Sequence, residues 1–279
     1  MGRRTGARRL TAVADHSLTI VLPAYNEEAR LGSALDELFG YLHRRGDHAR
    51  DGRPGAEALP AEIHVLVVDD GSTDGTGDLV RARPELGSGE LELLAVPHGG
   101  KGAAVRAGML AARGDLVVFA DADMATPPDE LVPLVEALEH ADAAYGSRIQ
   151  PDGSDMRKSQ PPWRRALGKA FHLLASAWVA GPIQDTQCGF KGFRREVARD
   201  VFARQRIAGI VFDVEVIYLV RRRGYRHVVV PVHWADRRGS RMHPGFLLAN
   251  RVAWDLMRIP LLHRDVRRAA RETTDQPAG

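Results

Sequence analysis

Two aspartates, Asp121 and Asp123, stand one residue apart at the end of a short apolar run. The run covers residues 115–120 and is followed by Pro127 and Pro128, which is typical of a buried strand that delivers its last residues to the edge of a sheet. Two carboxylates placed this close repel each other unless a cation lies between them. A hard divalent cation held by one or two carboxylates usually completes its shell with phosphate oxygens. The pair therefore suggests a divalent metal site for a phosphorylated ligand, although a solvated turn at a strand end would have the same spacing.

Polar and turn-forming residues also follow the two strands predicted before this one. The first strand leads into Pro-Ala-Tyr-Asn-Glu-Glu (23–28), and the second leads into Asp-Asp-Gly-Ser-Thr-Asp-Gly-Thr (69–76). Ligands of open α/β sheets bind at the carboxyl ends of parallel strands, so we expect these segments to meet the aspartate pair in one crevice. Asn26 and Asp74 could instead act as helix N-caps, a role that suits Asp70 less well because Asp70 precedes the turn.

The elements that must position these residues alternate between strand and helix through the first half of the chain. We predict strands at 18–22, 63–68, 91–96 and 116–120, and helices at about 27–45, after residue 74, at 102–113 and at 129–140. A loop rich in Gly, Pro, Ala and Asp is expected at 46–60. This alternation implies an α/β layered domain with a largely parallel central sheet flanked by helices.

The second half of the chain is predicted to be mostly helical. We expect helices at 163–179, 196–203, 214–223 and 244–259, a turn region at 182–193 and one strand at 227–232. The predicted organisation is a disordered basic tail (1–16), one catalytic domain (17–243), an amphipathic C-terminal helix (244–264) and a disordered tail (265–279).

The composition limits the possible partners. The C-terminal third is basic, with thirteen arginines against three acids between residues 221 and 271. Such a segment could attract nucleic acid, anionic lipid or a phosphorylated substrate, but no nucleic-acid-binding motif accompanies it. The single Cys188 excludes an internal disulfide framework and suits a reducing cytoplasm. The longest nearly apolar stretch, 173–183, is too short to span a bilayer, and we expect no secretory signal.

Several common catalytic motifs do not occur. The run Gly-Gly-Lys-Gly (99–102) lacks the spacing of a P-loop, and no Gly-x-Gly-x-x-Gly follows the first strand. Neither a His-Glu-x-x-His zinc motif nor a Gly-x-Ser-x-Gly nucleophile elbow occurs. These absences argue against P-loop NTPases, dinucleotide oxidoreductases, metalloproteases of that type and serine hydrolases.

Taken together, the segments at 23–27, 68–76 and 121–123 resemble the nucleotide-sugar half of family 2 inverting glycosyltransferases. That resemblance implies a GT-A type fold. Within the family, the second half is similar to dolichyl-phosphate β-glucosyltransferases over Gly146-Ser-Arg148, Arg164 with Phe171-His-Leu-Leu174, Asp185-Thr-Gln-Cys-Gly-Phe-Lys191, Phe212-Asp-Val-Glu215, Pro231-Val-His-Trp234 and Gly239-Ser-Arg241. The resemblance spans roughly residues 18–260.

The resemblance implies roles for the residues of the donor site. The residues expected to hold the base and ribose of a nucleotide sugar are Pro23, Tyr25, Glu27, Val68 and Asp70. Asp121 and Asp123 would bind Mg²⁺ or Mn²⁺ at the diphosphate, with Ala122 between them beside the substrate. Lys101 is expected to reach the diphosphate as a point charge.

The acceptor implied by the resemblance is a polyprenyl phosphate. A phosphate monoester is already ionised near neutral pH, with a second pKa of about 6, so positioning should matter more than a general base. Arg148 and Arg164 are the expected clamp on this phosphate. Asp213 and Glu215 are expected to line the acceptor or sugar side, and Arg241 to close over the diphosphate.

The C-terminal helix combines apolar and basic residues, so we expect it to lie on an anionic membrane surface. The apolar residues are Phe246, Leu247, Leu248, Trp254 and Leu256, and the basic ones are Arg251, Arg258, Arg264, Arg267 and Arg268. The alternative is a helix packed on the catalytic domain with a solvated basic end. The corresponding location is cytoplasmic and peripheral, on the inner face of the cell membrane.

The leading hypothesis is transfer of glucose from UDP-glucose to a polyprenyl phosphate, with inversion. A polyprenyl-phosphate mannosyltransferase that uses GDP-mannose is the close alternative. A nucleotidyltransferase is a third possibility, but residues 23–28 lack the Gly-rich signature expected of one after the first strand. A non-catalytic nucleotide-sugar-binding protein is disfavoured because Asp70, Asp121 and Asp123 are all present.

Overall fold

A central sheet of seven strands carries the residues of interest. In the computed structural model, the described residues are 16–50, 59–154, 179, 181, 183, 185–235 and 246–269. The strands are β1 (Ser17–Ala24), β2 (Glu62–Asp69), β3 (Leu91–Ala95), β4 (Leu116–Ala120), β5 (Ala143–Ser147), β6 (Phe190–Arg194) and β7 (His227–Pro231). Their order across the sheet is β3-β2-β1-β4-β6-β5-β7.

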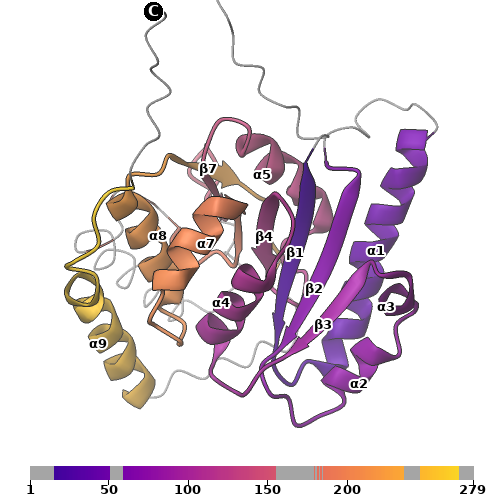
Figure 1. The fold of residues 1–279 in the computed structure, drawn as a ribbon, viewed down its shortest axis with the longest axis horizontal. Coiled ribbons are helices and arrows are strands. Elements are labelled where there is room, and N and C mark those ends of the chain that lie inside the picture. The colour runs from indigo at the N-terminus through magenta and orange to yellow at the C-terminus, as the bar shows by residue number, and fades with distance from the viewer. Residues whose placement is uncertain are drawn as a thin grey trace, which may run out of the picture.

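The sheet is largely parallel, with β6 running against both of its neighbours. The register pairs Ala24 of β1 with Asp69 of β2, and Val21 of β1 with Phe119 of β4. The loops that follow β1, β2 and β4 therefore leave the sheet at the same edge, which is the lower end of the molecule in Figure 1. This edge is where ligands bind in parallel α/β sheets.

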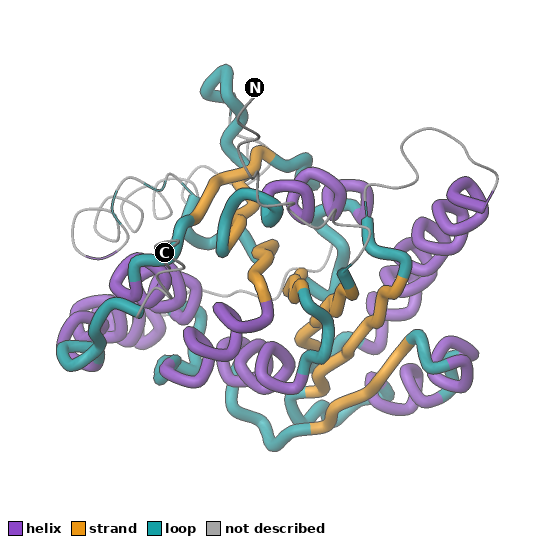
Figure 2. Tube along the Cα trace, turned by 45° about the horizontal axis from the view of Figure 1, so that its top comes forward, coloured by secondary structure: helices purple, strands orange, loops and turns teal. Residues whose placement is uncertain are grey.

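Helices cover both faces of the sheet (Figures 1 and 2). They are α1 (Glu28–Arg50), α2 (Thr76–Arg81), α3 (Pro84–Ser88), α4 (Lys101–Ala111), α5 (Leu131–Ala137), α7 (Arg195–Arg204), α8 (Phe212–Arg223) and α9 (Phe246–Leu262), with a 3₁₀ turn at Pro128–Glu130. Along β1, Ile20 and Leu22 join one buried cluster with α1 and α5, whereas Val21 joins another with α4, α7 and α8. Strands buried on both faces have nearly continuous apolar runs, as β1, β2 and β4 do.

Most of the predicted elements are confirmed, but three details differ. Helix α1 continues to Arg50, so the loop expected from residue 46 starts later. Strand β5 was not predicted, and β6 replaces the end of the turn expected at 182–193. The sequence of β6, Phe-Lys-Gly-Phe-Arg, shows no apolar strand pattern because its Lys191 is buried through an ion pair rather than by being apolar.

Other predictions concern residues that are not described. The helix expected at 163–179 lies outside the described residues except for Val179, and the tails expected at 1–16 and 265–279 lie outside them except for residues 16 and 265–269. Residues 265–269 are described, and the backbone N–H of Ala269 donates to the carbonyl of Arg223 at the end of α8. Within the described ranges, none of the helices has the length and apolar character needed to cross a bilayer.

Candidate active site

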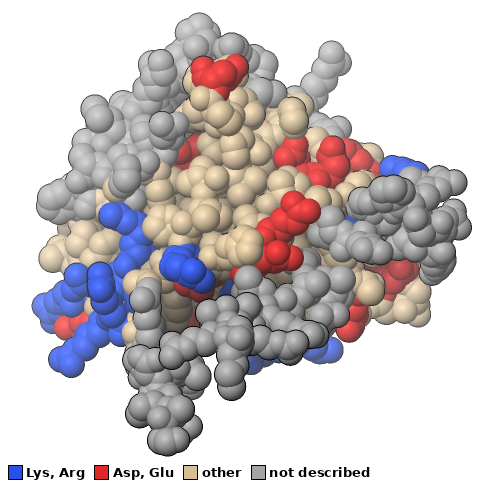
Figure 3. Space-filling model, turned by 90° about the horizontal axis from the view of Figure 1, so that it is seen from above, with Lys and Arg blue, Asp and Glu red and all other residues tan. Residues whose placement is uncertain are grey.

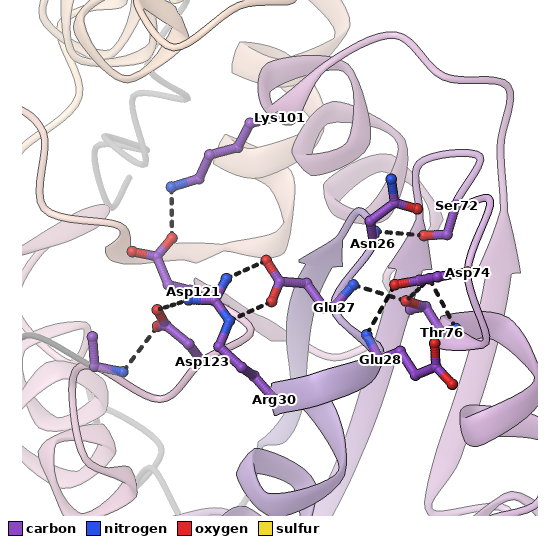
Figure 4. A network of polar contacts seen from close by, with 11 residues as sticks. Asn26, Glu27, Glu28, Arg30, Ser72, Asp74, Thr76, Lys101, Asp121 and Asp123 are labelled. Atoms are coloured by element: carbon purple, nitrogen blue, oxygen red, sulfur yellow. Dashed lines mark hydrogen bonds and ion pairs between the residues drawn. The ribbon is translucent and has the colours of Figure 1, made fainter. Parts of the chain in front are cut away.

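The loops after β1 and β2 are held together by hydrogen bonds. The backbone N–H of Asn26 donates to Ser72 Oγ at 2.9 Å, and that of Glu27 donates to Thr76 Oγ1 at 2.8 Å (Figure 4). Asp74 accepts from the backbone N–H of Glu28 at the start of α1 and from that of Thr76 at the start of α2. Asp74 therefore holds the two loops and the starts of α1 and α2 together, which supports the interpretation of Asp74 as a helix-capping residue.

Asp70 anchors the loop that leads into α4. Its two carboxylate oxygens accept the backbone N–H groups of Gly99 and Gly100 at 2.8 and 2.9 Å. The side chain is almost completely buried, and His98 Nδ1 lies 2.9 Å from Asp70 Oδ2. The structure thus gives Asp70 a role in placing Lys101, the first residue of α4, in addition to its expected contact with the nucleoside.

The other residues expected at the nucleoside differ in accessibility. Tyr25 is exposed and stacks on the ring of His98, with centroids 4.1 Å apart. Pro23 is half-buried at the same strand end. The side chain of Val68 lies wholly in the core between the sheet and α4, so a side-chain contact with the base is excluded for Val68. His98 was not predicted, since nothing in the sequence pairs it with Tyr25.

Each aspartate of the Asp121–Asp123 pair lies beside a cation of the chain (Figure 4). Lys101 Nζ lies 2.6 Å from Asp121 Oδ1. Arg30 Nη1 lies 3.5 Å from Asp123 Oδ2. Burial disfavours the charge on Lys101, but the carboxylates of Asp121 and Asp213 outweigh burial and raise the pKa of Lys101.

Arg30 also joins the two halves of the site. Its Nε and Nη2 donate to the carboxylate of Glu27 at 2.7 and 2.5 Å, so one guanidinium bridges Glu27 and Asp123. The contact between Glu27 and Arg30 has the three-residue spacing of neighbours on a helix. Arg30 was nevertheless not predicted as a site residue. The pKa of Asp123 is raised, mainly because the side chain is buried and secondly because the carboxylate of Asp121 repels its negative charge.

The aspartate pair fits a divalent cation. The side chains of Asp121 and Asp123 are 36% and 22% exposed, so both can be reached from solvent. Within the described part of the chain, no group of three or more His, Cys, Asp or Glu side chains could hold a metal ion. Two carboxylates with the remaining positions left to phosphate and water are what a Mg²⁺ site at a diphosphate requires.

The segment 185–191 contacts three of the expected site residues, which are Asp121, Arg148 and Asp213. Gly189 of this segment lies against Asp121. A Cβ placed on Gly189 would fall 2.3 Å from Asp121 Oδ2, so only glycine leaves room for the aspartate. Lys191, at the end of the segment, is completely buried and lies 2.6 Å from Asp213 Oδ1. Cys188 is buried, which raises the pKa of its thiol to about 12 and leaves it unreactive.

Arg148 is held by Asp185 of the same segment. Its Nε and Nη2 donate to the two oxygens of Asp185 at 2.8 and 2.7 Å, and its guanidinium lies over the ring of Trp234. Burial opposes the charge on Arg148, but Asp185 outweighs it and raises the pKa of the guanidinium. Arg148 is therefore a fixed cation, and among the described residues none accepts from its Nη1.

The two acids of α8 lie in different surroundings. Asp213 is buried within the electrostatic reach of Lys101 and Asp121, and burial raises its pKa. Glu215 is wholly buried, and its carboxylate accepts from the backbone N–H groups of Arg206 and Ile207, both at 2.8 Å. His263 Nε2 lies 2.7 Å from the same carboxylate. The expected contact of Glu215 with the sugar or acceptor is therefore wrong, because this carboxylate holds the loop before α8.

That loop in turn supports the start of α4. The carbonyl of Ala208 accepts from the backbone N–H groups of Gly102 and Ala103, next to Lys101. Glu215 is thus a positioning residue for the end of α4 that carries Lys101. The remaining predicted side chains, Arg164 and Arg241, lie outside the described residues.

The close approach of Gly189 to Asp121 gives a testable prediction. Gly189→Ala is expected to displace the Asp121 carboxylate and weaken Mn²⁺ binding by about tenfold or more, measured by calorimetric titration. Gly87→Ala is the matched control, since a Cβ there meets nothing within 4 Å. Equal Mn²⁺ affinity in the two variants would show that Asp121 does not depend on this space.

The chain matches the family model "Glycosyl transferase family 2" over residues 19–202. It is 34% identical to the dolichyl-phosphate beta-glucosyltransferase ALG5C of Trichomonas vaginalis over 93% of this chain and 75% of that protein. It is 36% identical to the dolichyl-phosphate beta-glucosyltransferase of Drosophila melanogaster over 81% of this chain and 69% of that protein.

A solved structure has a similar fold. It is the glucosyl-3-phosphoglycerate synthase of Mycobacterium tuberculosis in complex with Mn²⁺, UDP and phosphoglyceric acid. It superposes with a TM-score of 0.61 at 18% identity, over 96% of this chain and 86% of that one. The predicted GT-A type fold is confirmed by this likeness and by the sheet. The chain belongs to glycosyl transferase family 2 and is a glycosyltransferase similar over most of its length to dolichyl-phosphate beta-glucosyltransferases.

Proposed function

We propose that the protein transfers glucose from UDP-glucose to a polyprenyl phosphate of the dolichyl type, with inversion, in a reaction that depends on Mg²⁺ or Mn²⁺. The observation that carries the proposal is the meeting of Asp121 and Asp123 with Glu27, Lys101 and Arg148 around one sheet edge. The names of the relatives support the sugar and the acceptor.

The donor would lie across the ends of β1, β2 and β4. Tyr25 offers an exposed aromatic face on which a base can stack, and Glu27 can accept from ribose hydroxyl groups. Asp121 and Asp123 would hold the cation, which when bound neutralises the diphosphate of the leaving nucleotide. Lys101, which pairs with Asp121, would supply a positive charge to the diphosphate.

The acceptor needs little proton transfer. Its phosphate oxygen is ionised near neutral pH and attacks C1 of the glucose from the face opposite the diphosphate. A bond forms between C1 and the phosphate oxygen while the bond between C1 and the UDP oxygen breaks, which inverts the configuration. Arg148, held rigid by Asp185, would fix the acceptor phosphate, assisted by Arg164. Arg241 would close over the diphosphate.

Asp213 completes this arrangement as a buried acid near Lys101. Its carboxylate is neutralised by Lys191 and contributes to the raised pKa of Lys101. Asp213 would therefore help to keep Lys101 charged if the Asp121 carboxylate were engaged by a cation. We assign it this electrostatic role rather than that of a general base.

A donor panel tests the proposal. The protein would be incubated with Mn²⁺, a short polyprenyl phosphate in detergent, and radiolabelled UDP-glucose, UDP-galactose or GDP-mannose in separate reactions. We expect label in the organic phase from UDP-glucose. Label from GDP-mannose alone would assign the protein to the mannosyl alternative. Absence of lipid product from every donor would contradict the proposal. In a separate reaction with a nucleoside triphosphate and a sugar phosphate, release of pyrophosphate would indicate a nucleotidyltransferase and would also contradict it.

A further inference from the structure

His263 is a buried histidine directly after the end of α9. Its side chain is 1% exposed, whereas the next side chain, Arg264, is 80% exposed. Its Nε2 lies 2.7 Å from Glu215 Oε1. Both oxygens of the Glu215 carboxylate already accept from backbone N–H groups, so His263 Nε2 is the donor in this contact. Two polar side chains are therefore withdrawn from solvent to join the end of α9 to α8.

Helix α9 is also packed on the domain by apolar side chains. Leu256 and Ile259 belong to the same buried cluster as Ile207 and Phe212. Leu256 was expected on the membrane-facing side of the helix, and this expectation is wrong because Leu256 is buried in that cluster. Trp254, which was expected on the same side, is 66% exposed. The side chains at 246–248 lie outside the described part of α9.

The loop between α7 and α8 (residues 205–211) connects Glu215 to the start of α4. Gln205 Nε2 donates to the carbonyls of Gly102 and Ile207 at 2.8 and 2.9 Å. The carbonyl of Ala208 accepts from the backbone N–H groups of Gly102 and Ala103 at 2.8 and 3.3 Å. A Cβ on Gly102 would fall 2.8 Å from the carbonyl oxygen of Ile207, so the loop and α4 can approach this closely only with glycine there.

Lys101 is thus held from two sides. The carboxylate of Asp70 accepts from the backbone N–H groups of the two residues before Lys101, and the loop 205–211 holds the two residues after it. The side chain of Lys101 reaches Asp121, with 2.6 Å between Nζ and Oδ1. A continuous series of contacts therefore runs from His263 through Glu215 and the loop to Lys101.

We propose that His263 is a positioning residue of the active site, because its contact with Glu215 holds the loop 205–211 against α4 and so fixes Lys101 beside Asp121. Without His263, Glu215 Oε1 would keep only the backbone N–H of Arg206 as a donor. A buried carboxylate that loses a donor holds its remaining partners less firmly, so the loop would open more often. The role of Lys101 at the diphosphate rests on the proposed function, whereas the link between His263 and α4 does not.

The link lies inside the molecule and is separate from the basic surface next to it. Figure 3 views the molecule from the edge opposite the active site and shows basic side chains gathered at the left, over the ends of α8 and α9. Arg264 belongs to this surface and lines a cavity there with Arg221 and Arg222. His263 is buried, so a neutral substitution at this position tests the link without changing the surface.

Hydrogen exchange of backbone amides tests the link in the protein without ligands. Four amides join the loop to Glu215 and to α4, and they belong to Gly102, Ala103, Arg206 and Ile207. In the wild type we expect them to be protected and to open together, with one dependence on denaturant. H263L removes the donor but keeps an apolar side chain, and should raise all four exchange rates by about tenfold or more. H263Q keeps an N–H donor and should restore most of the protection.

Tyr225→Phe is the matched control. The hydroxyl of Tyr225 donates to Asp200 Oδ2 at 2.9 Å beyond the other end of α8, so this variant also removes one hydrogen bond to a carboxylate. It should leave the exchange of the same four amides unchanged, because the contacts of Asp200 with Arg204 and Arg223 lie outside the series that leads to Lys101.

A double-variant cycle tests whether His263 acts through Lys101. Calorimetry would measure the affinity for UDP in the presence of Mn²⁺. H263L should lower this affinity by about fivefold, and H263Q should restore it. Lys101→Met should lower it further, and adding H263L to Lys101→Met should cause no further loss. A general loss of structure would instead lower the affinity by the same factor in both backgrounds.

Four results would overturn the inference: separate opening of the loop amides and the α4 amides in the wild type, unchanged exchange in H263L, equally faster exchange in the Tyr225→Phe control, or multiplied losses of affinity in the double variant. The wild-type measurement decides the matter even if H263L does not fold. The donor panel separates this inference from the proposed function. Transfer of glucose with unchanged exchange in H263L contradicts only the link, and the expected exchange without any transfer contradicts only the proposed reaction.

Discussion

Replacing Asp123 with asparagine is expected to lower kcat/KM for metal-dependent transfer by about a thousandfold, or about 4 kcal/mol of transition-state stabilisation. Asparagine keeps the shape of the side chain, and its oxygen can still accept from the backbone N–H of Ala125. It loses the charge that, on our proposal, would hold the cation at the diphosphate. Steady-state kinetics with varied Mn²⁺ would measure this loss.

The same substitution should not weaken the fold. Burial and the nearby Asp121 raise the pKa of Asp123, so the folded protein without metal already disfavours its charge. The melting temperature of metal-free D123N should therefore equal or exceed that of the wild type. Asp78→Asn, at a highly exposed position on α2, is the control and should leave both turnover and stability unchanged. Turnover of D123N within about tenfold of the wild type, roughly 1.4 kcal/mol, would remove Asp123 from the metal site.

The second large effect is expected at the buried pair of Lys191 and Asp213. Lys191→Met should lower the free energy of unfolding by about 3–5 kcal/mol, because it leaves the buried carboxylate of Asp213 without its cation. Denaturant unfolding would measure the loss. Arg81→Met, which breaks the exposed pair with Asp78, should cost less than about 1 kcal/mol.

A double variant separates stability from catalysis. Lys191→Met with Asp213→Leu removes both charges and should recover most of the lost stability. It should not recover turnover, since Asp213 also faces Lys101 and helps to keep that lysine charged. Full recovery of both properties would limit the pair to a structural role, and a loss below about 1 kcal/mol in the single variant would contradict its burial.

The sheet edge at which we propose that the donor binds could be predicted from the sequence because it follows from one topological rule. The polar segments after β1, β2 and β4 had to meet once the strands were parallel, and the structure places them at one edge. The strands themselves are buried on both faces and therefore carry clear apolar runs. Fold class and the placement of Glu27, Asp70 and Asp121 at one edge of the sheet both follow from this pattern.

The second half was harder to predict because its contacts are remote in sequence. Glu215 reads as an acid at a helix start, and only the fold brings His263 to its carboxylate. Strand β6 contains a buried lysine, which no hydrophobic pattern can identify. The need for glycine at position 189, just before β6, depends on Asp121, which follows β4. The pairing of charged side chains that are remote in sequence cannot be predicted from local residue spacing.

The most direct measurement is the anomeric configuration of the lipid product. The protein would be incubated with UDP-glucose labelled with ¹³C at C1, a polyprenyl phosphate and Mn²⁺, and the product examined by NMR. We predict a β-linked glucosyl phosphate, formed with the metal and lost when a chelator is added. An α-linked product, or equal product in the presence of the chelator, would contradict a metal-dependent inverting transfer at Asp121 and Asp123.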